Sequence, residues 1–208
     1  MFTSNCPRRF YRALPTTATG PFSFVLALAN KMNNSRLSYE DSCKILQKNY
    51  IDSGHIPPLP SRIPRYDDPE PTGVSLFRTF IGESDDLSNL TLPRTFIGRT
   101  EINNALFKNT NLSESSICWN DLTDVDFTDA ILSQSDMRAS NFTRVLFVRA
   151  NLTGVDLRQS TFENCSFDLA IVTGVILTKI QGQMLKLTNL QHAVIDWRDS
   201  AGEEPEGG

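Results

Sequence analysis

The sequence predicts an all-β solenoid of about five coils, in which a short repeat winds around a narrow hydrophobic interior. The first observation is a five-residue period, because every fifth residue from Leu87 to Leu177 is hydrophobic, at nineteen successive positions. This period fits neither an α-helix, with about 3.6 residues per turn, nor a strand that alternates every two residues. A fixed internal repeat is typical of solenoids, whose units bury their hydrophobic side only by stacking on their neighbours.

The second observation concerns residues twenty positions apart, which hold similar side chains. Two such columns supply the clearest candidates for a structural core: Phe107, Phe127, Phe147 and Phe167 in one, and Leu92, Leu112, Leu132 and Leu152 in the other. The position two residues before each hydrophobic centre is mostly small or β-branched, so two inward side chains of unequal size recur in every five residues. We therefore predict a four-sided coil of twenty residues.

The five-residue motif resembles that of the pentapeptide-repeat family, A(D/N)LXX. Matching segments are Asp-Leu-Thr-Asp-Val at 121–125, Asp-Phe-Thr-Asp-Ala at 126–130, Ala-Asn-Leu-Thr-Gly at 150–154 and Val-Asp-Leu-Arg-Gln at 155–159. Members of this family form a right-handed quadrilateral β-helix with four pentapeptides per coil. The resemblance implies that fold for residues 76–182.

The segment before the repeats, residues 32–75, is predicted to contain a helix and a proline-rich strap. Ser38, followed three residues later by Asp41, is a helix-start signal, and we expect a helix over about 38–49. Six prolines in 57–71 exclude a helix there. We favour a structural strap that joins the helix to the solenoid, with a ligand for an SH3-type domain as the alternative.

Both ends of the solenoid are marked in the sequence. Arg-Thr-Phe-Ile-Gly occurs at 78–82 and again at 94–98, sixteen residues apart, so we expect one extra residue and a bulge near 83–86. The period stops at Gly182. Residues 183–198 are predicted to form a C-terminal cap, as a short helix or an irregular coil, and 199–208 a disordered acidic tail.

The first 31 residues are expected to be a poorly ordered or mis-assigned extension, with Met32 as the alternative start. Arginines precede the hydrophobic run at 22–29, but that run is short and opens with Pro21, so we expect a cytoplasmic protein without an export signal in residues 1–29. The four cysteines are far apart and form no CxxC pair, which favours a reducing compartment. Cys165 is expected to point inward and Cys118 to lie outside.

Catalysis is not predicted, because the sequence offers no convergent polar site. His55 and His192 lie near neither a candidate nucleophile nor each other in the chain. Asp121, Asp124, Asp126 and Asp129 are close in sequence, but the coil should point them along different sides, which argues against a calcium site. We expect no catalytic, metal-binding or cofactor-binding residue and no cofactor.

The charge pattern bears on a second reading of the function. The family includes proteins that shield a type II topoisomerase, DNA gyrase, from inhibitors and are proposed to mimic duplex DNA. Residues 83–177 hold thirteen acidic and seven basic residues, but the bases lie among the acids, and only Asp136–Asp156 resembles a negative column. A DNA mimic is therefore the alternative function. The net charge of −4 predicts no direct nucleic-acid partner, and no stretch approaches the roughly 20 hydrophobic residues of a membrane span.

The favoured function is a non-catalytic scaffold that binds a protein partner not identified by the sequence. Ile131, Val148, Leu169 and Ile171 fall on outward positions and form a hydrophobic strip, and Trp119 points outward on another side. Exposed strips of this kind are normally covered. We expect the helix at 38–49 or the strap to cover it, with a partner protein or a second copy of the chain, in a homodimer, as the alternative.

Overall fold

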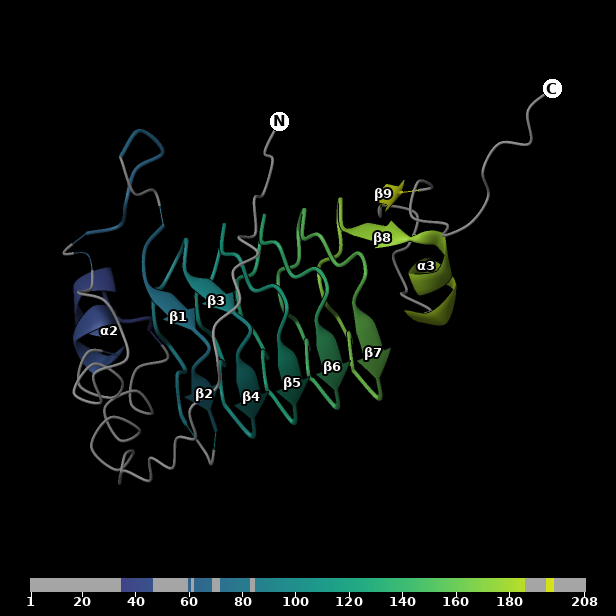
Figure 1. Ribbon diagram of the computed structural model, residues 1–208, viewed down its shortest axis with the longest axis horizontal. Coiled ribbons are helices and arrows are strands. Elements are labelled where there is room, and N and C mark those ends of the chain that lie inside the picture. The colour runs from purple at the N-terminus through teal and green to yellow at the C-terminus, as the bar shows by residue number, and fades with distance from the viewer. Residues whose placement is uncertain are drawn as a thin grey trace.

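A computed structural model describes residues 35–46, 60, 62–68, 72–82, 85–185 and 194–196. These residues form a rod of stacked coils with a helix at either end (Figure 1). The elements in chain order are α2 Tyr39–Leu46, β1 Ser75–Phe77, β2 Phe80–Ile81, β3 Phe96–Gly98, β4 Glu101–Asn103, β5 Asp121–Thr123, β6 Asn141–Thr143, β7 Thr161–Glu163, β8 Ile176–Thr178, α3 Lys179–Leu185 and β9 Val194–Asp196. The predictions for 1–31, 199–208, His55 and His192 fall outside the described residues.

The coil has twenty residues and four sides, as the sequence predicted. One side is the parallel sheet β2-β4-β5-β6-β7, in which Ile102, Leu122, Phe142 and Phe162 pair in succession, each twenty residues after the last. The other sides are joined mainly by single parallel bridges of the same spacing, with the parallel pairs β1–β3 and β8–β9 at the two ends of the rod. Four regular coils span 96–175, and an irregular one begins at Ser75, so the prediction of about five coils is confirmed.

Each corner of the coil is made by a residue with left-handed backbone, two positions after a hydrophobic centre. In the described coils the φ angles of these residues lie between 51° and 69°, at seventeen non-glycine residues, Gly154 and Gly174. The conformation disfavours residues with a Cβ atom, and asparagine and aspartate tolerate it best among them. Its cost is offset by inter-coil hydrogen bonds, as where the Asp129 N–H donates to the Val148 carbonyl at 2.9 Å.

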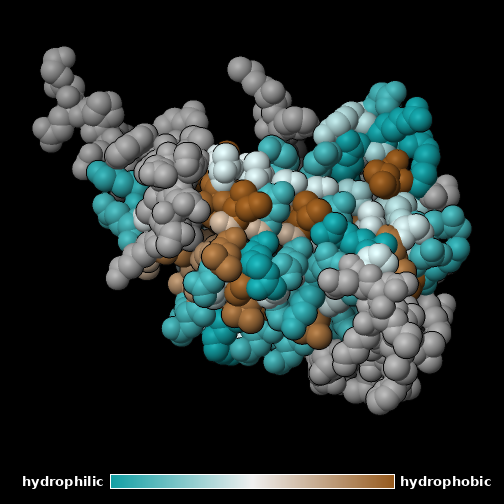
Figure 2. Space-filling view, turned by 180° about the vertical axis from the view of Figure 1, so that it is seen from behind, coloured by the Kyte–Doolittle hydropathy of each residue, from teal (hydrophilic) through white to brown (hydrophobic). Residues whose placement is uncertain are grey.

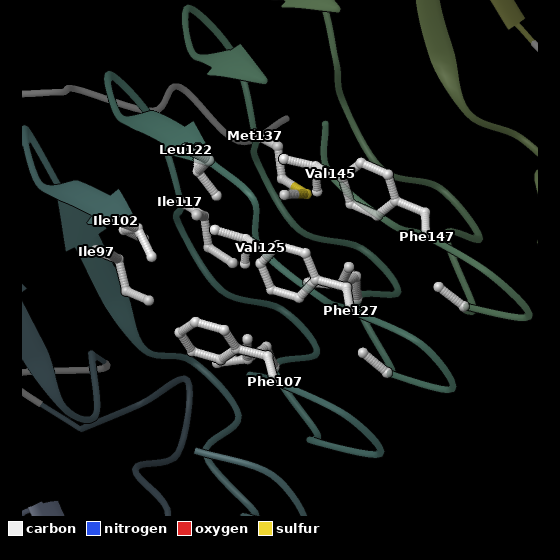
Figure 3. Packing of buried hydrophobic residues seen from close by; sticks show 14 of the residues in the cluster. Ile97, Ile102, Phe107, Ile117, Leu122, Val125, Phe127, Met137, Val145 and Phe147 are labelled. Atoms are coloured by element: carbon white, nitrogen blue, oxygen red, sulfur yellow. The ribbon is translucent and has the colours of Figure 1, made fainter. Parts of the chain in front are cut away.

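The interior is filled by the columns predicted from the sequence (Figure 3). Phe107, Phe127 and Phe147 are buried and stacked, with ring centroids 5.0 and 5.4 Å apart. Phe167 continues the stack at 4.9 Å from Phe147 but is only partly buried. The leucine column is buried throughout: Leu92, Leu112, Leu132 and Leu152. Each column is buried along most of the rod, so the spacing of its residues in the sequence is enough to define how the coils stack.

Serine and threonine at the small inward positions are buried without losing hydrogen bonds. Ser135 shows the arrangement: its hydroxyl donates to the Leu112 carbonyl at 2.8 Å and accepts the Ser115 N–H at 3.2 Å. The Thr110 hydroxyl likewise donates to the Leu87 carbonyl, at 2.6 Å. These side chains bridge successive coils, which removes the penalty for a buried hydroxyl.

Helix α2 covers the first coil of the rod. Ser38 caps it, because its Oγ accepts the Asp41 N–H at 3.1 Å. The Leu37 N–H donates to the Asn89 carbonyl at 2.7 Å, and the Thr91 N–H donates to Ser42 Oγ at 2.9 Å. The expectation that this helix covers the hydrophobic strip is therefore wrong. The first coil exposes unpaired backbone groups and a hydrophobic cross-section, which need the helix more than a side of the rod does.

The expected register fault lies where the first coil closes. Ile81 pairs with Ile102, twenty-one residues on, whereas Asp86 pairs with Leu106, twenty residues on. One extra residue therefore lies between Ile81 and Asp86. Gly82 and Asp85 close this segment, since the Gly82 N–H donates to Asp85 Oδ2 and the Asp85 N–H donates to the Gly82 carbonyl, both at 3.1 Å.

The last coil ends in helix α3, which begins at Lys179, three residues before the predicted end of the repeats. Gln181 is buried, and its Nε2 donates to the carbonyls of Leu157 and Ser160, each at 2.7 Å. These carbonyls would otherwise lack a next coil to bond. Strand β8 then gains a parallel partner in β9, which lies within the predicted cap 183–198.

Candidate functional site

Of the residues predicted to form an interface, Leu169 and Ile171 are the most accessible on the strip. Leu169 is 77% exposed and Ile171 50%, whereas Ile131 and Val148 are half-buried. Leu146, which the sequence analysis did not select, is also exposed, on the preceding coil. We call Leu146, Val148, Leu169 and Ile171 the Leu169 patch.

The Leu169 patch surrounds one corner of the rod near its C-terminal end. Asn151 bridges Ile171, and Leu146 bridges Ser166, so the members belong to two consecutive coils. Seen from the side opposite to that of Figure 1, the rod carries separate hydrophobic groups among hydrophilic side chains (Figure 2). A binding partner would therefore meet hydrophobic side chains bordered by polar ones.

Trp119 lies on a different corner, so it does not extend the strip. It is 50% exposed, and its corner joins the side of Ile117 to the side of Leu122, whereas Leu169 joins those of Phe167 and Val172. These two corners are diagonally opposite in a four-sided coil. Trp119 and Leu169 share an unusual property, because both are large exposed hydrophobic residues in the left-handed conformation, with φ of 62° and 59°.

Exposed aromatic residues near Trp119 were missed by the sequence analysis. Phe77 and Phe80 are 41% and 45% exposed, on the first coil. The signal was present in the repeated Arg-Thr-Phe-Ile-Gly segments, whose glycines leave room for a ring: a Cβ at Gly82 would meet the Phe80 ring, and one at Gly98 the Phe96 ring.

The acidic residues of the corners are neutralised by arginines one coil away. Arg144 forms a bidentate pair with Asp124, at 2.6 and 2.7 Å, and Arg149 forms one with Asp129, at 2.7 and 2.8 Å. Hydrogen bonds from these arginines lower the pKa of both carboxyl groups below its ordinary value. Asp124 and Asp129 are corner residues, whereas Asp121 lies in β5 and Asp126 on the following side, so the four aspartates at 121–129 do not converge.

The one predicted negative column is neutralised as well. Asp136 and Asp156 stack on neighbouring coils, as expected. Arg138 Nη2 lies 2.8 Å from Asp136 Oδ2, and Arg158 Nη2 lies 2.7 Å from Asp156 Oδ2. Arg138 also reaches Asp156, with Nε at 3.6 Å from Oδ2. The column therefore presents alternating charges rather than a continuous negative surface.

A shallow pocket lies between the proline-rich strap and the rod. Arg94 holds the strap in two ways: its guanidinium lies 3.6 Å from the centre of the Tyr66 ring, and its Nη1 donates to the Pro64 carbonyl at 2.6 Å. Its Nε donates to Glu114, on the next coil of the rod, at 2.8 Å. The Tyr66 hydroxyl also donates to Glu114, at 2.6 Å. These bonds, Tyr66 first, lower the pKa of Glu114. The open volume is about 570 Å³.

The structure confirms the predicted position of one cysteine and contradicts that of another. Cys165 points inward, as expected, and burial raises the pKa of its thiol. Cys118 faces outward but is only 3% exposed, so the expectation of a surface thiol is wrong. Its Sγ lies 3.5 Å from Ser116 Oγ, among neighbouring side chains that cover it.

Within the described ranges, no three or more His, Cys, Asp or Glu side chains are grouped to hold a metal ion. The two helices described here are too short and too polar to cross a bilayer.

Comparisons with known proteins agree with this geometry. The sequence model of the family "Pentapeptide repeats" matches in eight copies, over 100–138, 121–159 and 140–178. No curated protein matches significantly.

Several solved structures are similar in part. The pentapeptide-repeat protein Rfr23 of the cyanobacterium Cyanothece 51142 is 13% identical, with 59% of this chain and 88% of that chain covered and a TM-score of 0.48. A pentapeptide-repeat protein of the Arabidopsis thaliana thylakoid lumen is 30% identical, with 48% of this chain and 66% of that chain covered and a TM-score of 0.28. The fluoroquinolone resistance protein QnrB1 is 18% identical, with 64% of this chain and 70% of that chain covered and a TM-score of 0.31.

The twenty-residue coil, its four inward columns and the matched repeats lead to one conclusion: residues 100–178 of this chain are pentapeptide repeats, stacked as a four-sided β-helix.

Proposed function

We propose that this protein is a non-catalytic scaffold that binds another protein through the Leu169 patch. The carrying observation is Leu169 itself, which is 77% exposed at a corner position where the backbone favours asparagine, aspartate or glycine. Leucine at this position is neither buried nor favoured by the local backbone conformation, so the stability of the fold does not explain its presence. A hydrophobic residue at such a site, with other exposed hydrophobic residues around it, is best explained by a bound partner.

The neighbours of Leu169 support a binding surface. Ile171 is exposed across the corner, and Leu146 and Val148 lie on the coil before it. Arg149 and Asp129 border these residues as a bidentate ion pair. A hydrophobic centre with a charged rim is the usual composition of a protein interface. The rigid repeats hold these side chains at fixed spacings, which reduces the entropy lost on binding.

The charge distribution does not favour the alternative function, a DNA mimic that binds DNA gyrase. Such a mimic requires continuous negative columns, whereas Asp124, Asp129, Asp136 and Asp156 each bind an arginine. Neutral ion pairs present little net field to a protein that binds DNA phosphates.

Affinity capture from the source cells, combined with matched variants, tests the proposal. The double variant Leu169→Asp/Ile171→Asp adds two negative charges to the patch. A control, Gln159→Asp/Asn164→Asp, adds the same charges at exposed corner positions elsewhere. We expect to capture a protein that binds the wild type and the control but not the patch variant. If the partner is a second copy of the chain, we expect the wild type and the control to self-associate and the patch variant to remain monomeric. Identical captured proteins for all three, without self-association, would contradict the proposal.

A further inference from the structure

One corner of the rod differs from the other three in its charges. Three corner columns hold an arginine and a carboxylate on adjacent coils, as the pairs Arg94–Glu114, Arg144–Asp124 and Arg149–Asp129. The fourth column runs through positions 78, 99, 119, 139, 159 and 179, which are Arg, Arg, Trp, Ala, Gln and Lys. Unlike the other three columns, this column contains no carboxylate.

The same corner carries the exposed aromatic residues of the first coils. Phe77, Phe80 and Trp119 are 41%, 45% and 50% exposed, and Arg78 and Arg99 are exposed between them. The guanidinium of Arg78 lies 5.5 Å from the Phe77 ring centre, and the Phe77 ring stacks on Phe96 at 6.0 Å. We call Phe77, Arg78, Phe80, Arg99 and Trp119 the Arg99 corner.

The nearest carboxylates belong to the adjacent sheet and are hydrogen-bonded along it. Glu101 accepts a hydrogen bond from Asn103 Nδ2, and Asp121 accepts one from Asn141 Nδ2, both at 2.7 Å. Both carboxylates therefore have partners within the sheet. They also place negative charge beside the corner, which disfavours a ligand that is negative along its whole length.

We infer that the Arg99 corner binds an extended segment of a partner protein in which a single acidic side chain lies between hydrophobic side chains on one face of the segment. A carboxylate of the segment would bind the guanidinium of Arg99 and supply the charge that this column lacks. The hydrophobic side chains would pack on Trp119, Phe77 and Phe80. Exposed tryptophan and arginine together are the residue types that dominate binding energy at protein interfaces.

The dimensions fit a short peptide. Neighbouring coils lie about 4.8 Å apart, so Arg78 and Trp119 are separated by roughly 10 Å, the length of about three residues of extended chain. The left-handed backbone at Arg78, Arg99 and Trp119 turns all three side chains out from one edge. The inference rests on the proposed function only in that both require the rod to bind proteins. The Arg99 corner shares no residue with the Leu169 patch.

Single-stranded nucleic acid is the competing ligand, because it too binds arginine and stacked aromatic residues. The net charge of −4 and the adjacent Glu101 and Asp121 disfavour a phosphate backbone. Binding of an oligothymidylate in preference to a peptide would overturn the inference.

Fluorescence anisotropy with a labelled synthetic peptide of sequence Ser-Leu-Ser-Glu-Ser-Leu-Ser, whose leucines and glutamate share one face when it is extended, provides the test. We expect wild-type chain to bind it, more weakly as salt is added. Trp119→Asn should weaken binding at least about tenfold, and Arg99→Gln should weaken it by about threefold or more. Arg144→Gln, which removes the same charge from a paired corner, is the matched control and should leave binding unchanged. Circular dichroism confirms that each variant is folded.

Three other results would overturn the inference. They are no binding to the wild type, equal binding of the same peptide with glutamine in place of its glutamate, and equal effects of Arg144→Gln and Arg99→Gln. Because the Leu169 patch variant leaves this corner intact, its results are independent of these.

Discussion

Replacement of Phe147 by alanine tests the phenylalanine column as the main source of stability. Phe147 is fully buried, stacks between Phe127 at 5.4 Å and Phe167 at 4.9 Å, and meets Phe142 edge-on at 5.8 Å. A buried Phe→Ala substitution costs about 3–5 kcal/mol, and each aromatic pair contributes about 0.5–1.5 kcal/mol beyond burial. We therefore expect a loss near 5 kcal/mol in the free energy of unfolding, comparable to the total stability of many small domains, about 5–15 kcal/mol.

Urea denaturation followed by circular dichroism measures this loss, and two further variants locate it. Phe167→Ala removes a partly buried ring that stacks on one side only, so we expect roughly half the cost. Phe147→Leu keeps most of the volume but loses the three ring contacts, so it should cost clearly less than Phe147→Ala without being neutral. Phe147→Asp places a carboxylate in the column and should prevent folding. Equal costs for Phe147→Ala and Phe167→Ala would refute the reasoning, as would a soluble and unchanged Phe147→Asp variant.

Three further predictions concern the strap, the cap and the alternative function. The pKa of Glu114 is lowered in the folded protein, so its contribution to strap docking is present above the ordinary carboxyl pKa and is lost as the pH falls through the folded value. Intrinsic amide exchange itself slows on acidification, so the quantity to measure is the protection of residues 62–68 relative to their intrinsic exchange rates. This protection should fall on acidification, and protection that stays the same would contradict the prediction. Gln181→Ala leaves the Ser160 carbonyl without this donor and the Leu157 carbonyl with only the Ser160 N–H, at 3.3 Å, so it should cost about 1–3 kcal/mol in a thermal unfolding experiment, whereas the exposed control Gln183→Ala should cost almost nothing. In a supercoiling assay, the protein at micromolar concentration should neither inhibit DNA gyrase nor protect it, and either effect would revive the DNA-mimic reading.

The sequence predicted the regular part of the fold because one interaction repeats there. Residues such as Phe107 and Phe127 meet the same neighbours in every coil, so their spacing specifies coil length, side number and register together. The extra residue near 83–86 was visible for the same reason. A departure from a strict period is as informative as the period itself.

The ends and the surfaces were harder to predict, because their partners are unique. The docking of α2 on Asn89 and Thr91 depends on hydrogen bonds between segments that share no repeat. The ion pair of Arg94 with Glu114 follows from the twenty-residue spacing, but its contact with Tyr66 does not. Burial of Cys118 likewise depends on its neighbours' conformations, which the period does not specify.

The central claim is that exposed hydrophobic residues at left-handed corners serve binding and not folding. Substitution of Leu169 by asparagine tests it most directly, because asparagine suits this conformation and removes exposed hydrophobic surface. The measurement is the free energy of unfolding in urea. We predict a value equal to that of the wild type or up to about 1 kcal/mol higher, in a protein that no longer captures its partner. A clear loss of stability would show that Leu169 supports the fold and would contradict the account.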